Sequence, residues 1–87
     1  MDETILFSVE EIKNAEIKNT LKEVYESLKI RGYNPINQIV GFIISGDPGY
    51  ISNFQDARSK MISLDRSELV SLLLKNYMEQ KWVEYLP

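Results

Sequence analysis

The stretch of sequence that decides the fold is Gly32–Ile51, GYNPINQIVGFIISGDPGYI. It holds all four glycines, two of the three prolines and the most apolar run of the chain. Asn34 is a strong N-cap residue, and Pro35 suits the first helical position because its missing N–H is not needed there. Gly46 fits a left-handed helix end. These signals predict a short helix that begins at Pro35 and ends at Gly46.

The apolar residues of this helix have helical spacing, although their β-branched content also permits a strand. We expect the buried stripe to consist of Ile36, Ile39, Val40, Ile43 and Ile44. Gly41 inside the helix costs about 1 kcal/mol of helix propensity relative to alanine, which suggests that another backbone approaches closely there. Asp47-Pro48-Gly49 then forms a turn signal.

Amide and aromatic side chains around this helix are the candidates for an interface. Asn37 and Gln38 are not explained by capping, so they hydrogen-bond across an interface, orient the turn after the helix, or simply face water. By default we expect the aromatic residues Tyr33, Phe42 and Tyr50 to belong to the core. The more specific alternative is that they anchor a partner at an interface. The predicted interface comprises Tyr33, Asn37, Gln38, Gly41, Phe42 and Tyr50.

Three further helices are predicted around this one. Residues 12–30 carry one apolar stripe at helical spacing, and residues 53–62 follow a Ser-x-x-Gln capping box at 52–55. A last helix over about residues 66–80 follows a cap at Asp65. Its apolar face is wider than a single stripe, so this helix either lies centrally or meets a second subunit.

The two ends of the chain differ in character. Residues 1–9 alternate apolar positions with the period of a strand, but an isolated strand has no partner, so we interpret them as a flexible arm. Residues 81–87 are apolar enough that we expect them to pack against something. The prediction is an all-α fold: a small single domain of about four short helices, with an arm at 1–9 and a helical domain at 10–87.

The small size of the chain favours self-association. A domain of 87 residues buries only about 60–65% of the surface that its unfolded chain exposes. Small domains usually add disulfides, a metal or a partner subunit, and this chain has neither cysteine nor histidine. We therefore predict a homodimer, with a well-packed monomer as the alternative.

Charge and hydropathy narrow the class of protein. The net charge is −3, so the chain lacks the basic face that sequence-independent nucleic-acid binding requires. No apolar run follows a basic N-terminal segment, and the runs at 39–44 and 70–74 are too short to cross a bilayer. With no cysteine, these features predict a cytoplasmic protein that neither inserts into membranes nor binds nucleic acid.

The residue types needed for common catalytic sites are missing. Without histidine or cysteine, Ser-His-Asp catalysis, thiol nucleophiles and Cys/His zinc sites are excluded. Asp47, Asp56 and Asp65 lack the dense alternation of a calcium loop. The glycines are not followed by Gly-Lys-Ser/Thr, so they do not form a phosphate-binding loop. We predict a non-enzymatic protein without cofactor or metal.

Several motifs together carry a family resemblance. They are GYNPINQIVG at 32–41, Ser45-Gly46-Asp47-Pro48, Tyr50-Ile51, Asp56-Ala57-Arg58, the opening Asp2-Glu3-Thr4, and Asp65-Arg66-x-Glu68-Leu69. This combination closely resembles the IreB family, small cytosolic proteins of low-GC Gram-positive bacteria. The resemblance covers nearly the whole chain.

The resemblance implies a regulatory phosphoprotein. The family's best-known member is a homodimer, a substrate of a transmembrane serine/threonine kinase with extracellular PASTA domains, and a negative regulator of resistance to cell-wall antibiotics. Its phosphoacceptor threonines lie in the N-terminal arm, and one in an Asp-Glu-Thr context matches Thr4. The expected partners are a second copy of the chain, a serine/threonine kinase with its opposing phosphatase, and an unidentified downstream protein.

A mechanism and an alternative follow from these expectations. Phosphate on Thr4 adds about −1.5 to −2 charge at neutral pH. That charge is attracted to arginines such as Arg31, Arg58 or Arg66, so phosphorylation could dock or release the arm. The alternative function is a small helix-turn-helix-like nucleic-acid-binding protein, because short dimerising helices fit that class, although the acidic balance argues against it.

Overall fold

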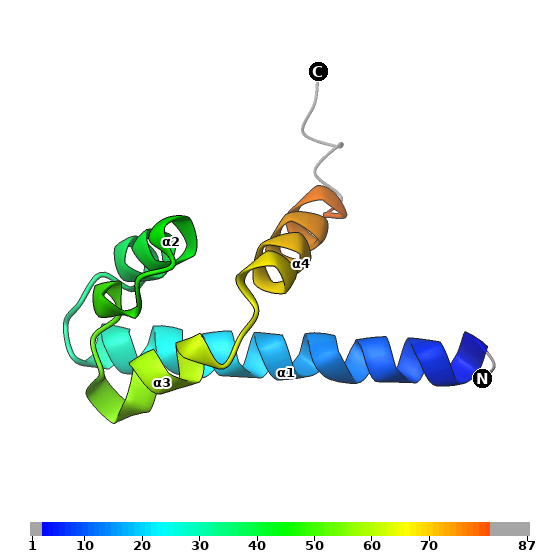
Figure 1. Cartoon of the computed structure of the whole chain (residues 1–87), viewed down its shortest axis with the longest axis horizontal. Helices are drawn as coiled ribbons and strands as arrows, with labels where there is room; N and C mark the ends of the chain where they lie inside the picture. The colour runs from blue at the N-terminus through cyan, green and yellow to red at the C-terminus, as the bar shows by residue number, and fades with distance from the viewer. Residues whose placement is uncertain (1–2, 81–87) are drawn as a thin grey trace, which may run out of the picture.

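The computed structural model describes the backbone of residues 3–80 and the side chains of residues 9–80. All regular structure in residues 3–80 is helical, which confirms the predicted all-α fold with four α-helices (Figure 1). The elements are α1 (Glu3–Ile30), α2 (Pro35–Ser45), η1 (Pro48–Tyr50), η2 (Phe54–Asp56), α3 (Ala57–Ile62) and α4 (Arg66–Met78). None of the helices in this part of the chain is long and apolar enough to span a bilayer.

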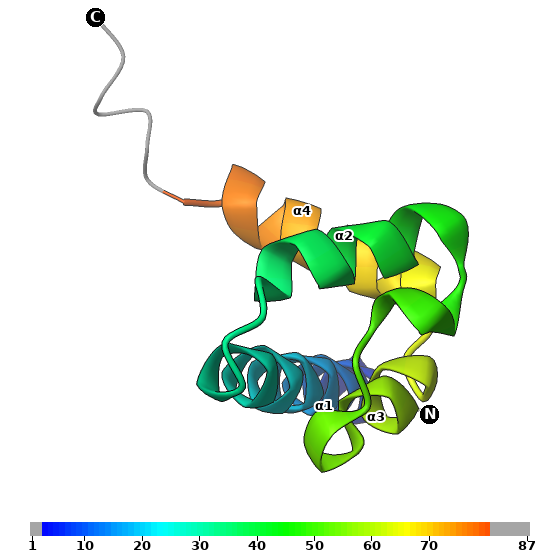
Figure 2. The ribbon, with the colours of Figure 1, turned by 90° about the vertical axis from the view of Figure 1, so that its left-hand side faces the viewer.

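Helix α1 is the long helix against which the other helices pack (Figure 1). It has 28 residues, and α3 lies along its C-terminal half while α2 and α4 lie on one side of it (Figures 1 and 2). The helix begins at Glu3 rather than near Ile12, so it includes most of the segment predicted as an arm. With no strand to pair with, these residues continue the helix that follows them. The flexibility of the arm stays a prediction.

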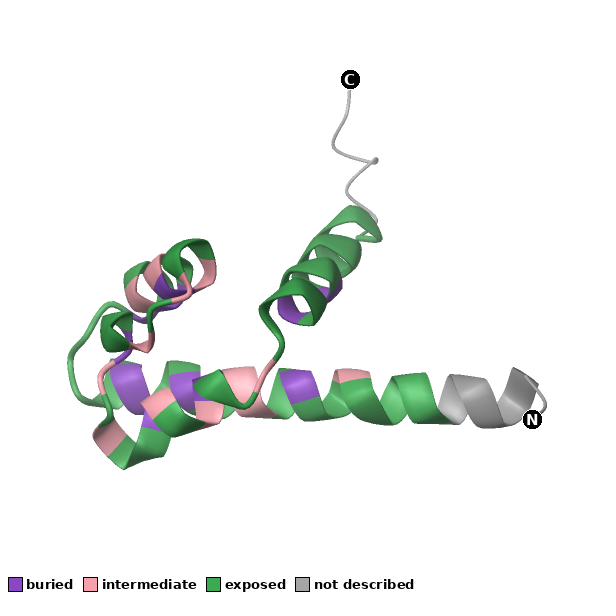
Figure 3. Ribbon diagram, viewed as in Figure 1, coloured by how far each residue is buried: buried purple, intermediate pink, exposed green. Residues whose placement is uncertain are grey.

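The core lies at one end of α1. Its members come from all four α-helices and from the segment between η1 and η2, and they are Ile17, Val24, Leu28, Ile39, Phe42, Ile51, Ala57, Met61, Leu69 and Leu72. Figure 3 shows the buried positions gathered in the C-terminal half of α1 and on the facing sides of the shorter helices. Residues 9–13 of α1 are all exposed. The N-terminal half of α1 therefore projects beyond the core.

The ends of α2 match the signals in its sequence. The Asn34 Oδ1 atom accepts a hydrogen bond from the Asn37 backbone N–H at 3.1 Å, as an N-cap does. Gly46 has φ of 74° and its N–H donates to the Phe42 carbonyl at 2.7 Å. A left-handed residue at this position closes the last turn, which explains glycine there.

The start of α3 differs from the prediction. The Ser52 N–H and hydroxyl are held by Gln38 instead of forming a capping box. The chain makes the short helix η2 and turns through Gln55 and Asp56, with φ of 54° and 61°, before α3 begins. The buried Ser27 hydroxyl donates to Gln55 Oε1 at 2.7 Å, which helps to hold this unusual backbone. A tertiary hydrogen bond thus replaces the predicted local one.

Helix α4 begins as predicted but does not lie centrally. The Asp65 side chain caps it by accepting from the Glu68 N–H at 3.0 Å. Only Leu69 and Leu72 reach the core. Arg66 Nη1 donates to the Ile43 carbonyl of α2 at 3.0 Å, and its guanidinium lies against Gly46. One edge of α4 therefore contacts the other helices, and the rest of its apolar face is exposed.

Candidate functional site

The most distinctive surface of the chain is one side of α2. Ile36, Val40 and Ile44 are spaced four residues apart and are all exposed, Ile44 by 79%. We call these three side chains the outer face of α2. Helix α2 contains no charged residue, whereas exposed helix faces are normally charged. A solvent-exposed apolar ladder without charges has the composition of the centre of a protein interface.

This surface corrects the predicted burial of α2. The sequence analysis placed Ile36, Val40 and Ile44 in the buried stripe, and that was wrong. The core side of α2 is formed by Pro35, Ile39 and Phe42, with Ile43 packed beside them. Both sides of the helix are apolar, so the sequence gives no local signal for which side turns inward.

Tyr50 lies against the backbone of α2 at Gly41. A Cβ atom on Gly41 would overlap the Tyr50 ring, with the ring Cγ only 2.9 Å away. The expected close approach at Gly41 is therefore present, but an aromatic ring makes it rather than a second backbone. Tyr50 is also half exposed. Gly41 thus leaves room for the Tyr50 ring against the backbone of α2, while about half of Tyr50 stays exposed.

Gln38 joins α2 to the segment after η1. Its Oε1 atom accepts from the Ser52 backbone N–H at 2.9 Å, and its Nε2 atom donates to Ser52 Oγ at 3.2 Å. Of the three alternatives given for Asn37 and Gln38, the hydrogen bonds of Gln38 match the one in which the side chain orients the segment after α2. The Asn37 side chain is exposed, and its backbone N–H receives the Asn34 cap. Only Asn37 of this pair is left available to a partner.

The other predicted aromatic residues separate into core and surface. Phe42 is buried in the core and is not accessible to a partner in this chain. Tyr33 is exposed, and its N–H donates to the Leu28 carbonyl in the turn that ends α1. Of the predicted interface residues, Tyr33, Asn37 and Tyr50 are therefore exposed, in addition to the outer face of α2.

Thr4 lies far from this surface. It is the second residue of α1, and its side chain lies outside the described part of the chain. The structure consequently places its backbone at the N-terminus of the long helix, on the projecting end, whereas α2 packs at the other end (Figure 1).

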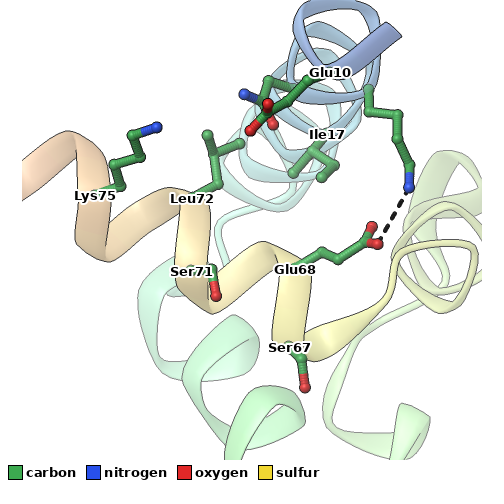
Figure 4. Close-up of a pocket in the computed structure, with 9 residues that line it drawn as sticks. Glu10, Ile17, Ser67, Glu68, Ser71, Leu72 and Lys75 are labelled. Carbon is green, nitrogen blue, oxygen red and sulfur yellow. Dashed lines mark hydrogen bonds and ion pairs between the residues drawn. The ribbon is translucent and has the colours of Figure 1, made fainter. Parts of the chain in front are cut away.

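A hollow lies between α1 and α4. It has a volume of about 340 Å³, with Ile17 and Leu72 between the two helices (Figure 4). Lys13 Nζ and Glu68 Oε1 form an ion pair of 3.3 Å across one side. Both partners are largely exposed, so this pair contributes little to stability. Within residues 9–80, no three acidic side chains gather closely enough to hold a metal ion.

The chain is similar to proteins of one bacterial family. A family model described as IreB regulatory phosphoprotein matches residues 2–79. A UPF0297 protein of Acetivibrio thermocellus is 51% identical over 79 residues, which cover 91% of this chain and 88% of the relative. A UPF0297 protein of Ruminiclostridium cellulolyticum is 49% identical over 79 residues, which cover 91% of this chain and 90% of the relative. The chain therefore belongs to the IreB family of regulatory phosphoproteins.

Proposed function

We propose that this chain is a cytoplasmic regulatory protein that acts by binding other proteins through the outer face of α2, under the control of a serine/threonine kinase and its opposing phosphatase. The observation that carries the proposal is the uncharged, exposed ladder of Ile36, Val40 and Ile44. Membership of a regulatory phosphoprotein family supports it. In this proposal the protein takes part in cell-wall stress or antibiotic-resistance signalling, and an unidentified protein receives the signal.

The partner that we propose for the outer face of α2 is a second copy of the chain. An uncharged face cannot select a partner by charge, but it is complementary to itself across a two-fold axis. Tyr33 and Tyr50, in the segments just before and after α2, are exposed, and aromatic side chains are enriched in interfaces. The homodimer that we propose therefore pairs α2 with α2.

The proposed phosphorylation site is Thr4, and the geometry of α1 limits how it can act. Arg31 follows the last residue of α1, whose 28 residues separate it from Thr4 by about 40 Å at about 1.5 Å per residue. Arg31 also lies over the Phe54 ring, 5.6 Å from its centroid. Phosphate on Thr4 consequently does not reach Arg31 of the same chain while α1 is continuous.

Phosphate on Thr4 instead acts on the start of α1. A negative group in the first turn of a helix stabilises it by about 0.3–1 kcal/mol through the helix dipole. It can also accept hydrogen bonds from the free backbone N–H groups there. In this proposal, phosphorylation stabilises the projecting end of α1 and changes what that end presents to a partner.

Kinase treatment followed by mass spectrometry tests the phosphorylation site. We expect incorporation of phosphate into the unmodified chain and its loss in Thr4→Ala. Thr20→Ala is the control, because Thr20 lies in the same helix but is partly buried. Undiminished phosphorylation of Thr4→Ala would refute the assignment.

Sedimentation tests the proposed dimer. Ile36 and Ile12 are both 58% exposed, and only Ile36 lies on the outer face of α2. An aspartate at position 36 falls in the first turn of α2, where it favours the helix, so Ile36→Asp leaves folding intact. We expect Ile36→Asp to sediment as a monomer and Ile12→Asp to remain a dimer. A monomeric unmodified chain, or a dimeric Ile36→Asp, would contradict the α2 interface.

A further inference from the structure

Residues 52–55 have the sequence of a capping box, yet the polar atoms that a capping box uses are bound elsewhere. In a capping box the Ser52 hydroxyl would accept from the Gln55 N–H, and the Gln55 side chain would accept from the Ser52 N–H. In this chain the Ser52 N–H donates to Gln38 Oε1 at 2.9 Å, and Ser52 Oγ accepts from Gln38 Nε2 at 3.2 Å. Gln55 Oε1 accepts from the buried Ser27 hydroxyl at 2.7 Å. The same atoms therefore suit two hydrogen-bond arrangements that exclude each other.

The observed arrangement requires a strained backbone. Gln55 and Asp56 have φ of 54° and 61°, in the left-handed region. This region is unfavourable for residues with a Cβ atom, which crowds a carbonyl oxygen there. Asp56 stands at the N-cap of α3, but its side chain makes no capping hydrogen bond that would compensate. Strained residues persist where other contacts hold them, and the hydrogen bond from Ser27 to Gln55 is such a contact.

The competing arrangement is a longer α3. With the capping box closed, residues 53–56 would take right-handed helical φ and extend α3, which has only six residues. So short a helix is marginal, and extension strengthens it. The Ser27 hydroxyl would then donate to the Glu23 carbonyl one turn earlier in α1, as serines in helices do. The partly exposed Gln38 amide would reach water. The competing arrangement thus also gives these polar groups partners.

We propose that residues 52–56 form a two-state switch: either they tie α1 and α2 together through Ser27 and Gln38, or they extend α3. Relief of strain at two residues and the loss of three hydrogen bonds are free energies of the same order. The switch couples α2 to α3. Whatever draws Gln38 away from Ser52 favours the longer α3, and whatever lengthens α3 releases α2 to the same degree. Because the contacts lie within one chain, this inference stands whether or not the outer face of α2 binds a partner.

A matched pair of double variants tests the switch. Ser27→Ala removes the hydrogen bond that holds Gln55, and alanine suits the interior of α1. In that background Asp56→Ala favours a right-handed helix, whereas Asp56→Gly favours the left-handed turn. Since the Asp56 side chain makes no capping hydrogen bond, the two variants differ in backbone preference at one position.

NMR spectroscopy measures which arrangement each variant adopts. Three-bond HN–Hα couplings report φ at residues 55 and 56, and an NOE from Hα of residue 53 to HN of residue 57 marks a full α-helical turn. We expect this NOE and negative φ in Ser27→Ala/Asp56→Ala. We expect positive φ without the NOE in Ser27→Ala/Asp56→Gly. Ser63→Ala is the control, because its hydroxyl donates to the Lys60 carbonyl and touches neither arrangement, so residues 53–56 should not change.

Two results would overturn the proposal. One is the same φ at residues 55 and 56 in both double variants. The other is an alanine variant in which residues 53–56 lose defined structure instead of joining α3. If a double variant does not fold, Asp56→Ala and Asp56→Gly are compared without Ser27→Ala, since both retain all three hydrogen bonds. The averaged couplings should then differ in the same direction, and equal couplings would overturn the switch.

Discussion

Replacing Gly41 with alanine has two opposing effects, and the structure decides which is larger. Alanine in the interior of a helix gains about 1 kcal/mol over glycine. In this chain the new methyl group would overlap the Tyr50 ring, with Cγ and Cε1 at 2.9 and 3.0 Å. Cγ is next to the root of the side chain, so rotation of the ring tip cannot relieve the overlap.

The overlap therefore has to displace η1 or move Tyr50 to another rotamer. Overpacking of this kind costs about 1–3 kcal/mol. Since η1 is followed by Ser52, which two hydrogen bonds tie to Gln38, displacement of this segment is resisted. We expect Gly41→Ala to lower the free energy of unfolding by about 1 kcal/mol, the overpacking cost less the propensity gain.

A double-mutant cycle with Tyr50→Ala isolates the contact. Without the ring, Gly41→Ala should become stabilising by about 1 kcal/mol. Urea unfolding followed by circular dichroism measures both changes, at one fixed protein concentration because association contributes to stability. For a small domain a change of 1 kcal/mol moves the midpoint by up to about 1 M urea. The reasoning is refuted if Gly41→Ala has the same sign and size in both backgrounds.

Other contacts give simpler predictions. Gln38→Ala removes both hydrogen bonds to Ser52 and leaves the partly buried Ser52 N–H without a partner. It should therefore lower the free energy of unfolding, measured in urea, by about 1–3 kcal/mol. A decrease near zero would show that these hydrogen bonds do not stabilise the fold. Arg66→Ala removes the bond to the Ile43 carbonyl, and faster amide hydrogen exchange in α4 is expected; unchanged exchange would show that this bond does not hold α4. Asp65→Ala removes the N-cap of α4 and should cost about 1 kcal/mol, whereas Asp65→Asn should be nearly neutral.

Helix ends were predictable because their signals are local. The Asn34 and Asp65 caps and the Gly46 C-cap each depend on residues within one turn of the helix end. The sequence therefore located both ends of α2 and the start of α4. The N-terminus of α1 was the exception. Residues 3–9 have the alternating pattern of a strand in their sequence, yet they belong to the continuous helix α1.

The choice of buried face was not predictable in α2. Ile36 and Ile39 are the same residue type on adjacent sides of one helix, yet Ile39 is buried and Ile36 is exposed. Which of the two side chains is buried depends on where α1 and η1 lie relative to α2. These positions are set by contacts between residues far apart in the sequence, so no local pattern reveals them. The same applies to Ser52, whose local capping signal is overridden by Gln38 from α2.

The predicted interface stays a prediction, but the exposure of its residues can be compared with the structure. Tyr33, Asn37 and Tyr50 are exposed, as an interface requires. The sequence analysis placed the aliphatic ladder of α2 in the core, because apolar residues at helical spacing are usually buried. The absence of charge in α2 was the sequence signal that could have indicated an exposed apolar ladder.

The missing charges on α2 also bear on how fast complexes form. Oppositely charged surfaces attract each other over a distance and can raise association rates to about 10⁸–10⁹ M⁻¹s⁻¹, whereas neutral surfaces meet at about 10⁵–10⁶ M⁻¹s⁻¹. A partner that docks on α2 has no such attraction at the point of contact. Complexes through α2 should therefore assemble slowly at low concentration, at a rate that ionic strength hardly changes, and their abundance should follow the amount of protein present.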